Sequence, residues 1–186
     1  MNYRGQEVFF DRNDLIVSKT DLKGILTYAN HTFLEIAGYR EDEVIGKPHN
    51  MIRHENMPRG VFEYFWQTLK QEQEIFAYVV NKTKSGDHYW VLAHVTPSYR
   101  DGHHVGYHST RRVPDPRVIK TVIEPLYDEM NAIEAATSGH KEGTAKSLAH
   151  LTELMNKKQT TYSEFMSSLM LGKSLIDGEG RHEHAA

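Results

Sequence analysis

The chain has 186 residues, of which 39% are hydrophobic, and its formal net charge is −3. This length suits one compact domain with an appendage. A near-neutral charge disfavours nucleic-acid binding, which needs an excess of lysine and arginine. No apolar run approaches the roughly 20 residues of a transmembrane helix, and the first residues have no signal-peptide core. We therefore expect a cytoplasmic protein that does not insert into a membrane.

Cysteine is absent from the sequence. This excludes disulfides, thiolate metal sites, iron–sulfur clusters, cysteine nucleophiles and photochemistry through a cysteine adduct. Histidine is abundant, with 12 residues, but His182 and His184 lie in a glycine- and charge-rich end. That composition predicts a flexible tail over residues 173–186.

The first residues predict a cap followed by a hairpin. Residues 1–13 are polar but contain Phe9 and Phe10, which we expect to pack two rings against the domain. Residues 14–20 and 25–29 are strand-like on either side of a turn, so they are predicted to pair as a hairpin.

Two helices are predicted before the next strand. The first begins at Asn30, a good N-cap, and ends at Gly38; a short acidic turn follows at Glu41–Val44. The second runs from Pro58 to Lys70 because its apolar residues recur at helical spacing. Those residues are Val61, Phe62, Phe65, Trp66 and Leu69.

Between these helices lies the most informative segment, GKPHNMIRHENMP at Gly46 to Pro58. It combines histidines, an arginine, asparagines and methionines, and so offers hydrogen-bond donors, a fixed positive charge and polarisable apolar contacts. This mixture favours a pocket wall. The alternative is a solvated loop with a short helical turn.

Three more strands are predicted at residues 75–83, 88–99 and 104–112, separated by turns. Beyond them, residues 114–172 form a predicted helical segment. One helix is expected from Asp115 to Ala136, with Pro125 either kinking it or restarting it, and a second from Ala145 to Leu171 after a loop at 138–143. An amphipathic helical hairpin must bury its apolar stripes against its own domain or another chain.

The order of strands and helices over residues 14–113 resembles a PAS sensor domain. The motifs TYANHTFLEIAGYREDEVIGKPHNMIRH, MP, FWQTLK and KSGDHYWV are similar to those of PAS sensors of the aerotaxis-receptor type. They are also similar to the stand-alone PAS proteins of bipartite energy-taxis receptors. The resemblance covers about residues 14–130. It implies an α+β PAS fold, a five-stranded antiparallel sheet with a helical flank, here followed by a C-terminal helical hairpin.

The resemblance also implies a flavin, FAD, in the PAS cavity; FMN and haem are the alternatives. Seven residues become candidate cofactor contacts: Asn30, Arg53, His54, Asn56, Phe62, Trp66 and Asn81. Arg53 offers a permanent charge for a pyrophosphate or a reduced flavin. The two amides Asn30 and Asn81 can pair with the edge of the flavin ring, and the aromatic residues can form its walls.

Several of these candidates have structural alternatives. His54 can be a structural hydrogen-bonding group, Asn30 only a helix cap, and Phe62 and Trp66 plain core. The chain also departs from the family pattern. Glu55 and Asn56 stand where the family has an aspartate, and Ile75 stands where it usually has a tryptophan.

The leading functional hypothesis is a redox or oxygen sensor for energy taxis that signals by contact with a chemoreceptor or another protein. We expect the chain to form a homodimer. A haem-based gas sensor with His54 or another pocket histidine as axial ligand and a cofactor-free dimerisation module are the alternatives. No nucleophile–base pattern, metal-ligand spacing or phosphate loop indicates an enzyme. We expect Asn81 to pass a change in flavin redox state to the C-terminal helices.

Overall fold

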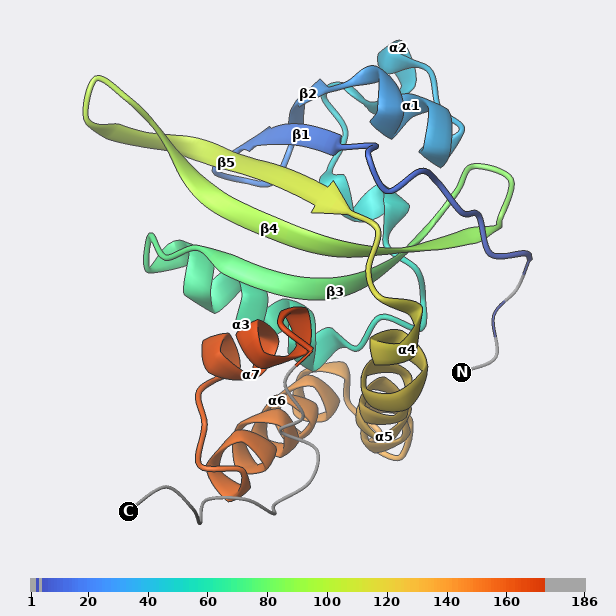
Figure 1. Cartoon of the computed structure of the whole chain (residues 1–186). Helices are drawn as coiled ribbons and strands as arrows, with labels where there is room; N and C mark the ends of the chain where they lie inside the picture. The colour runs from blue at the N-terminus through green and yellow to red at the C-terminus, as the bar shows by residue number, and fades with distance from the viewer. Residues whose placement is uncertain (1–2, 4, 173–186) are drawn as a thin grey trace, which may run out of the picture.

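A five-stranded antiparallel sheet forms the centre of the computed structural model, which describes residue 3 and residues 5–172 (Figure 1). The strands are β1 (Ile16–Asp21), β2 (Leu26–Ala29), β3 (Ile75–Lys82), β4 (His88–Arg100) and β5 (His103–Arg112). Their order across the sheet is β2-β1-β5-β4-β3. This arrangement confirms the predicted α+β fold and five-stranded sheet. The tail predicted at 173–186 lies outside the described residues.

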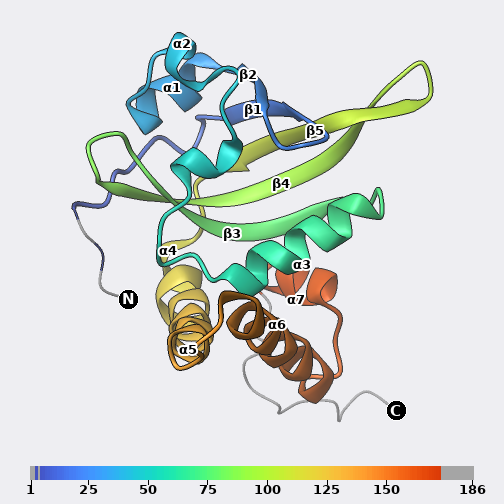
Figure 2. The ribbon, with the colours of Figure 1, turned by 180° about the vertical axis from the view of Figure 1, so that it is seen from behind.

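Between β2 and β3 the chain forms the helical flank, which lies over one face of the sheet (Figure 2). Its elements are α1 (His31–Ala37), α2 (Glu41–Val44), the 3-10 helix η1 (His49–Ile52) and α3 (Arg59–Lys70). Asn30 caps α1 by accepting a hydrogen bond from the Phe33 amide at 3.0 Å, as predicted. The stretch predicted as an acidic turn is the single helical turn α2.

The C-terminal helices are α4 (Pro116–Val118), the π-helix η2 (Ile119–Ile123), α5 (Glu124–Ala135), α6 (His140–Lys157) and α7 (Tyr162–Met170). Pro125 lies in the first turn of α5, where its missing N–H costs nothing. The sequence predicted a kink or a restart here, but Val118, Ile123 and Glu124 all keep right-handed helical angles, so the π-helix runs directly into α5. No helix among residues 5–172 has both the length and the apolarity to cross a membrane.

The prediction of one helix from Ala145 to Leu171 is wrong, because α6 and α7 are separate. Gln159 has a positive φ of 51° between them. Thr161 then starts α7 with a capping box, in which its hydroxyl accepts from the Glu164 amide at 3.2 Å and its own amide donates to Glu164 Oε2 at 2.8 Å. Apolar periodicity continues across this break and hid it, although the Thr-x-x-Glu signature was readable. The first helix of the pair also begins earlier than expected, at His140.

The C-terminal helices pack on their own domain. A Cβ on Gly60 of α3 would lie 2.6 Å from Ser147 Oγ of α6, so only glycine permits this close approach of the two helices. Buried Glu134 joins α5 to the same place, accepting from the Gly60 amide at 2.9 Å and pairing with Arg59 Nε at 3.2 Å. From α7, the ring of Tyr162 lies 4.6 Å from that of Tyr64 on α3.

Both apolar stripes are therefore covered within the chain. Leu151 and Met155 of α6 are buried, as are Phe165 and Leu169 of α7. Of the two possibilities left open by the sequence, its own domain or another chain, the chain's own domain covers these stripes. The physical reason is that α3 presents one face to the sheet and the opposite face to α6 and α7.

The N-terminal residues cap the sheet, but only in part as expected. Val8 N donates to His88 O at 2.7 Å, His88 N donates to Gln6 O at 3.0 Å, and Tyr3 stacks on the His88 ring at 4.1 Å. Phe10 packs against the core, whereas Phe9 is 76% exposed. The prediction that both rings are tucked in is wrong for Phe9.

Candidate functional site

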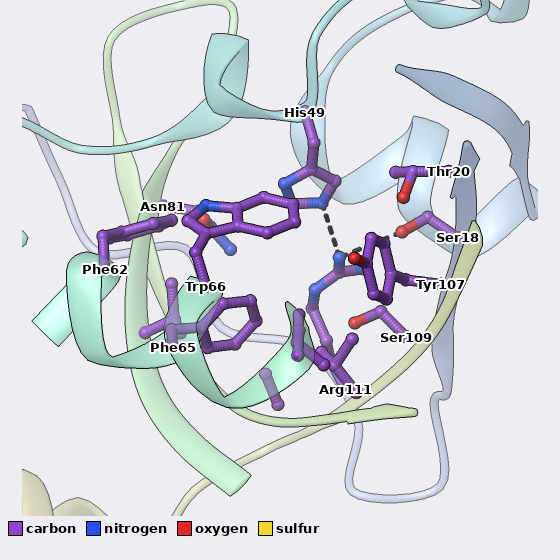
Figure 3. Close-up of a pocket in the computed structure, with 14 residues that line it drawn as sticks. Ser18, Thr20, His49, Phe62, Phe65, Trp66, Asn81, Tyr107, Ser109 and Arg111 are labelled. Atoms are coloured by element: carbon purple, nitrogen blue, oxygen red, sulfur yellow. Dashed lines mark hydrogen bonds between the residues drawn. The ribbon is translucent and has the colours of Figure 1, made fainter. Parts of the chain in front are cut away.

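A cavity lies between the inner face of the sheet and helix α3 (Figure 3). The centre of a water molecule can occupy about 50 Å³ of this cavity. The total empty space, including the part open to solvent, is about 570 Å³. The sheet has space for the cavity because two alanines lie beside Arg111 in one cross-strand row. In that row Arg111 of β5 pairs with Ala93 of β4, which pairs with Ala77 of β3.

Aromatic side chains from α3 form the opposite wall of this cavity. They are Phe62, Phe65 and Trp66, which the helical period places on the face toward the sheet. The Trp66 ring meets Tyr107 of β5 edge-on at 5.6 Å, and it lies between Phe62 and His49 in Figure 3. With Trp66 in this position the cavity is narrow.

Buried polar atoms without a partner gather at this cavity. Within residues 5–172, seven buried side-chain nitrogen or oxygen atoms have no hydrogen-bond partner, and four of them belong to residues lining this one space. These four are Thr20 Oγ1, Asn81 Nδ2, Ser109 Oγ and Arg111 Nη1. Leaving such an atom unpaired costs about 1–3 kcal/mol, and buried polar groups are normally paired. Four polar groups that face one cavity can therefore pair with a polar ligand or with water.

Arg111 is the charged centre of the cavity and is only 3% exposed. Its Nη2 lies 2.9 Å from Ser18 Oγ, to which it donates, and 2.6 Å from Nε2 of His49. Among the described residues it has no carboxylate partner, and burial lowers its pKa to about 10. A buried guanidinium with only neutral partners leaves the cavity with an uncompensated positive charge.

His49 is held neutral beside this arginine. Burial and the Arg111 charge lower the pKa of His49 to about 3, so its Nε2 accepts the Arg111 hydrogen bond and its proton resides on Nδ1. The residue comes from η1 in the segment that the sequence identified as a pocket wall. That interpretation of the Gly46–Pro58 segment agrees with the place of His49.

A wider hollow adjoins the cavity and shares His49, Phe62 and Trp66 with it. Its open space is about 880 Å³, and its other residues include the cations Lys23, Arg53 and Arg59. The Arg53 guanidinium lies 4.4 Å above the Phe62 ring and donates to Met57 O at 2.7 Å. The hollow is thus a basic vestibule outside the aromatic wall, and we refer to it below as the vestibule.

The structure separates the seven sequence candidates into two groups. Asn81, Phe62 and Trp66 line the cavity, and Arg53 lines the vestibule together with two of these. Asn81 extends from β3 and is 2% exposed. These four residues converge as expected for a ligand site.

Asn30, His54 and Asn56 do not line the cavity, and each forms hydrogen bonds with other groups of the protein. Asn30 Oδ1 accepts from the amides of Val17 and Phe33, and its Nδ2 donates to Leu15 O at 2.7 Å. His54 Nδ1 accepts from the Asn56 amide at 3.1 Å. Asn56 O accepts from Asn131 Nδ2 at 2.7 Å. In this structure these hydrogen bonds stabilise the start of α1 and the loop before α3.

Sequence reasoning missed the polar floor of the cavity. Tyr107, Ser109 and Arg111 occupy alternate positions of β5, and Ser18 and Thr20 do so on β1, so each set shares one face of the sheet. The alternation was visible in both predicted strands. The sequence did not indicate which face of the sheet turns toward α3, because neither face is uniformly apolar.

Acid should destabilise the protein through His49. Its folded pKa lies below the unfolded value of about 6.5, so the unfolded chain binds more protons below pH 6.5. The free energy of unfolding then falls as the pH drops from about 6.5 toward about 3, by at most about 1.4 kcal/mol per pH unit for this group. We expect His49→Gln to flatten this loss in urea titrations.

The control for the pH experiment is His31→Gln, because the His31 side chain is 92% exposed. This variant should follow the wild-type pH profile. Some acid sensitivity should persist in His49→Gln, since burial also lowers the pKa of His54 and His88. A profile for His49→Gln identical to that of the wild type would contradict the assignment of a neutral, enclosed His49.

Comparison with known proteins, like the observed fold, identifies a PAS domain. Residues 26–111 match the family profile described as PAS fold. Over 127 residues, 68% of this chain, the sequence is 42% identical to the aerotaxis receptor of Escherichia coli K12. It is 27% identical over 126 residues to the nitrogen fixation regulatory protein of Klebsiella pneumoniae. The chain spans about a quarter of the length of each of these relatives.

Solved structures with the same fold include light-oxygen-voltage domains. One, described in work on a flavin analogue and the mechanism of such a domain, has a TM-score of 0.53 at 18% identity, covering 62% of this chain and 87% of that one. The light-state structure of the aureochrome1 domain has a TM-score of 0.51 at 18% identity, covering 64% and 92%. At this identity the likeness concerns the fold alone.

Proposed function

Since this chain contains a PAS sensor domain of the aerotaxis-receptor type, we propose that it binds a flavin in the cavity and reports the redox state of that flavin by protein contact. One observation carries the proposal. Four unpartnered polar atoms, one of them on a buried arginine, converge on a cavity with an aromatic wall. A packed core gains nothing from such an arrangement, whereas a bound ligand would satisfy it.

The chemistry of these residues fits a flavin ring. The isoalloxazine system is planar and apolar on its faces and carries hydrogen-bonding groups along its edge, and it supplies reversible electron uptake. Phe62 and Trp66 match the faces. The Asn81 amide, the Ser109 hydroxyl and the Arg111 guanidinium match the edge. These residues hold and orient the ring and keep water from it.

The vestibule supports FAD over FMN. Lys23 and Arg53 line the vestibule, which shares Phe62 and Trp66 with the cavity, so phosphates attached to a ring in the cavity would emerge beside them. Guanidinium and ammonium groups suit a pyrophosphate. The open volume of the vestibule leaves room for the nucleotide half of FAD.

The alternatives have weaker support from this geometry. A haem iron needs a histidine nitrogen free inside the cavity, yet Nε2 of His49 accepts from Arg111 and His54 lies outside the lining. A cofactor-free dimerisation module would have no use for four unpaired polar atoms in one cavity. Neither alternative explains the buried charge.

The signal would leave the cavity through β3. Asn81 lies on this edge strand, and Tyr127 of α5 donates to Tyr78 O of the same strand at 2.6 Å. Helix α7 contacts β3 as well. We propose that a change at Asn81 reaches these helices and alters a contact with a chemoreceptor or another cytoplasmic signalling protein. In this proposal the chain is a homodimer, and it acts as a sensor and not as an enzyme. Transmission requires the two redox states to differ in affinity for the partner.

The test is reconstitution of the full chain with FAD, FMN and haem in separate samples. We expect a yellow protein with an absorption band near ~450 nm, a flavin released on denaturation, and tighter binding of FAD than of FMN. Isothermal titration with FAD gives the affinity. A protein that takes up neither flavin refutes the proposal, and an intense Soret band near ~400 nm would move the assignment to haem.

A further inference from the structure

The positive charge of Arg111 is buried without a negatively charged partner in the described part of the chain. It is 3% exposed, and no carboxylate among residues 5–172 pairs with it. Its two protein acceptors, Ser18 Oγ and His49 Nε2, are both neutral and both served by Nη2. Nη1 is left without a partner and belongs to the cavity lining.

The sheet prevents the side chain from escaping to water. Arg111 lies on the central strand β5, between Ile16 of β1 and Ala93 of β4 in register. Its guanidinium is 5.8 Å from the centre of the Phe33 ring, and its other protein contacts, Ser18 and His49, are neutral. Because Nη1 is unpaired and Arg111 lines the cavity, an anion in the cavity can supply the partner that this charge lacks among the described residues.

We propose that Arg111 makes the cavity selective for the anionic form of its ligand, and thereby sets the balance between oxidised and reduced flavin. This inference rests on the flavin proposal above and adds to it a residue that determines the redox preference. Arg53, which the sequence suggested for this role, lies in the vestibule and already donates to Met57 O. That position suits phosphate and not the ring.

The charge balance shows why an arginine matters here. Two electrons from a reduced electron carrier, with one proton from water, convert the neutral oxidised ring to a reduced ring with one negative charge. A second proton would make it neutral. A fixed cation in a space of low polarity favours the anion over both neutral forms, and His49 cannot supply this charge because it is itself neutral.

The experiment compares Arg111→Met, Arg111→Lys and the matched control Arg112→Met in the full chain. Arg112 is the next residue of the same strand, carries the same charge and is exposed. For each protein, affinities for oxidised FAD and for FAD reduced anaerobically with dithionite are measured with excess flavin. The midpoint potential of the bound flavin and the melting temperature of the flavin-free protein complete the set.

We expect Arg111→Met to lose at least ten-fold more affinity for reduced than for oxidised flavin. This corresponds to a midpoint potential lower by about 30 mV or more for a two-electron couple. Arg111→Lys should restore most of the preference, and Arg112→Met should match the wild type. The flavin-free Arg111→Met protein should melt at or above the wild-type temperature, because an uncompensated buried charge has been removed.

Equal losses of affinity for the two redox forms in Arg111→Met would overturn the inference while leaving flavin binding intact. So would a flavin-free variant that melts well below the wild type, since Arg111 would then be a structural residue. If the wild type takes up no FAD, the flavin proposal itself fails, and the inference fails with it.

Discussion

Asn81→Leu is expected to abolish most flavin binding without harming the fold. Asn81 is 2% exposed and its Nδ2 has no partner among the described residues. Leucine has a similar volume, so the cavity wall survives, but two hydrogen bonds to the edge of the ring are lost. At about 1–3 kcal/mol for each of the two hydrogen bonds proposed here, affinity for FAD should fall by roughly thirty-fold or more. Titration of the purified protein with FAD measures this loss.

The stability of the same variant provides an internal check. Without flavin, Asn81→Leu removes a buried amide whose Nδ2 has no partner of good geometry, and the variant should unfold at the same or a higher urea concentration than the wild type. Asn156→Leu, at an exposed position of α6, is the matched control and should bind FAD normally. Normal FAD binding by Asn81→Leu would show that this amide does not face the ring and would weaken the proposed route from the cavity to β3.

Phe165→Ala is expected to reduce the free energy of unfolding by about 3–5 kcal/mol, because it empties a fully buried aromatic site. Phe165 of α7 is 2% exposed and belongs to the same core as the sheet. The loss should appear in a single urea transition, since α7 and the PAS domain share that core. Circular dichroism followed against urea concentration measures it.

Leu171→Ala is the control for this experiment, since Leu171 is 69% exposed just beyond α7. Its effect on unfolding should remain within about 0.5 kcal/mol. If Phe165→Ala is as mild as the control, α7 does not pack on its own domain in solution. The alternative that the C-terminal helices bury their stripes against another chain would then be favoured.

Proline and glycine positions and apolar periodicity determined most of the secondary structure. Asn30 and Gly38 bound α1 in the sequence and in the structure. The predicted helix from Pro58 to Lys70 is α3 within one residue. The break at Gln159 was missed because a non-glycine residue adopts a positive φ there, which local propensity does not indicate.

The sequence also determined several wall residues of the site. Asn81 was identifiable because an amide within an apolar strand needs a partner, and Phe62 and Trp66 because they share a helical face. The segment Gly46–Pro58 was recognised from its mixture of donors and a fixed charge. These are local signals, readable within one element or from the resemblance to PAS sensors.

Only the tertiary structure decided where the buried charge lies. Arg53 and Arg111 are equally charged in the sequence, but pairing of β5 with β1 and β4 encloses Arg111, while Arg53 reaches the vestibule. Likewise, the close approach at Gly60 lets α6 and α7 cover α3. Enclosure and register depend on contacts between distant segments, so no pattern within a single element could assign them.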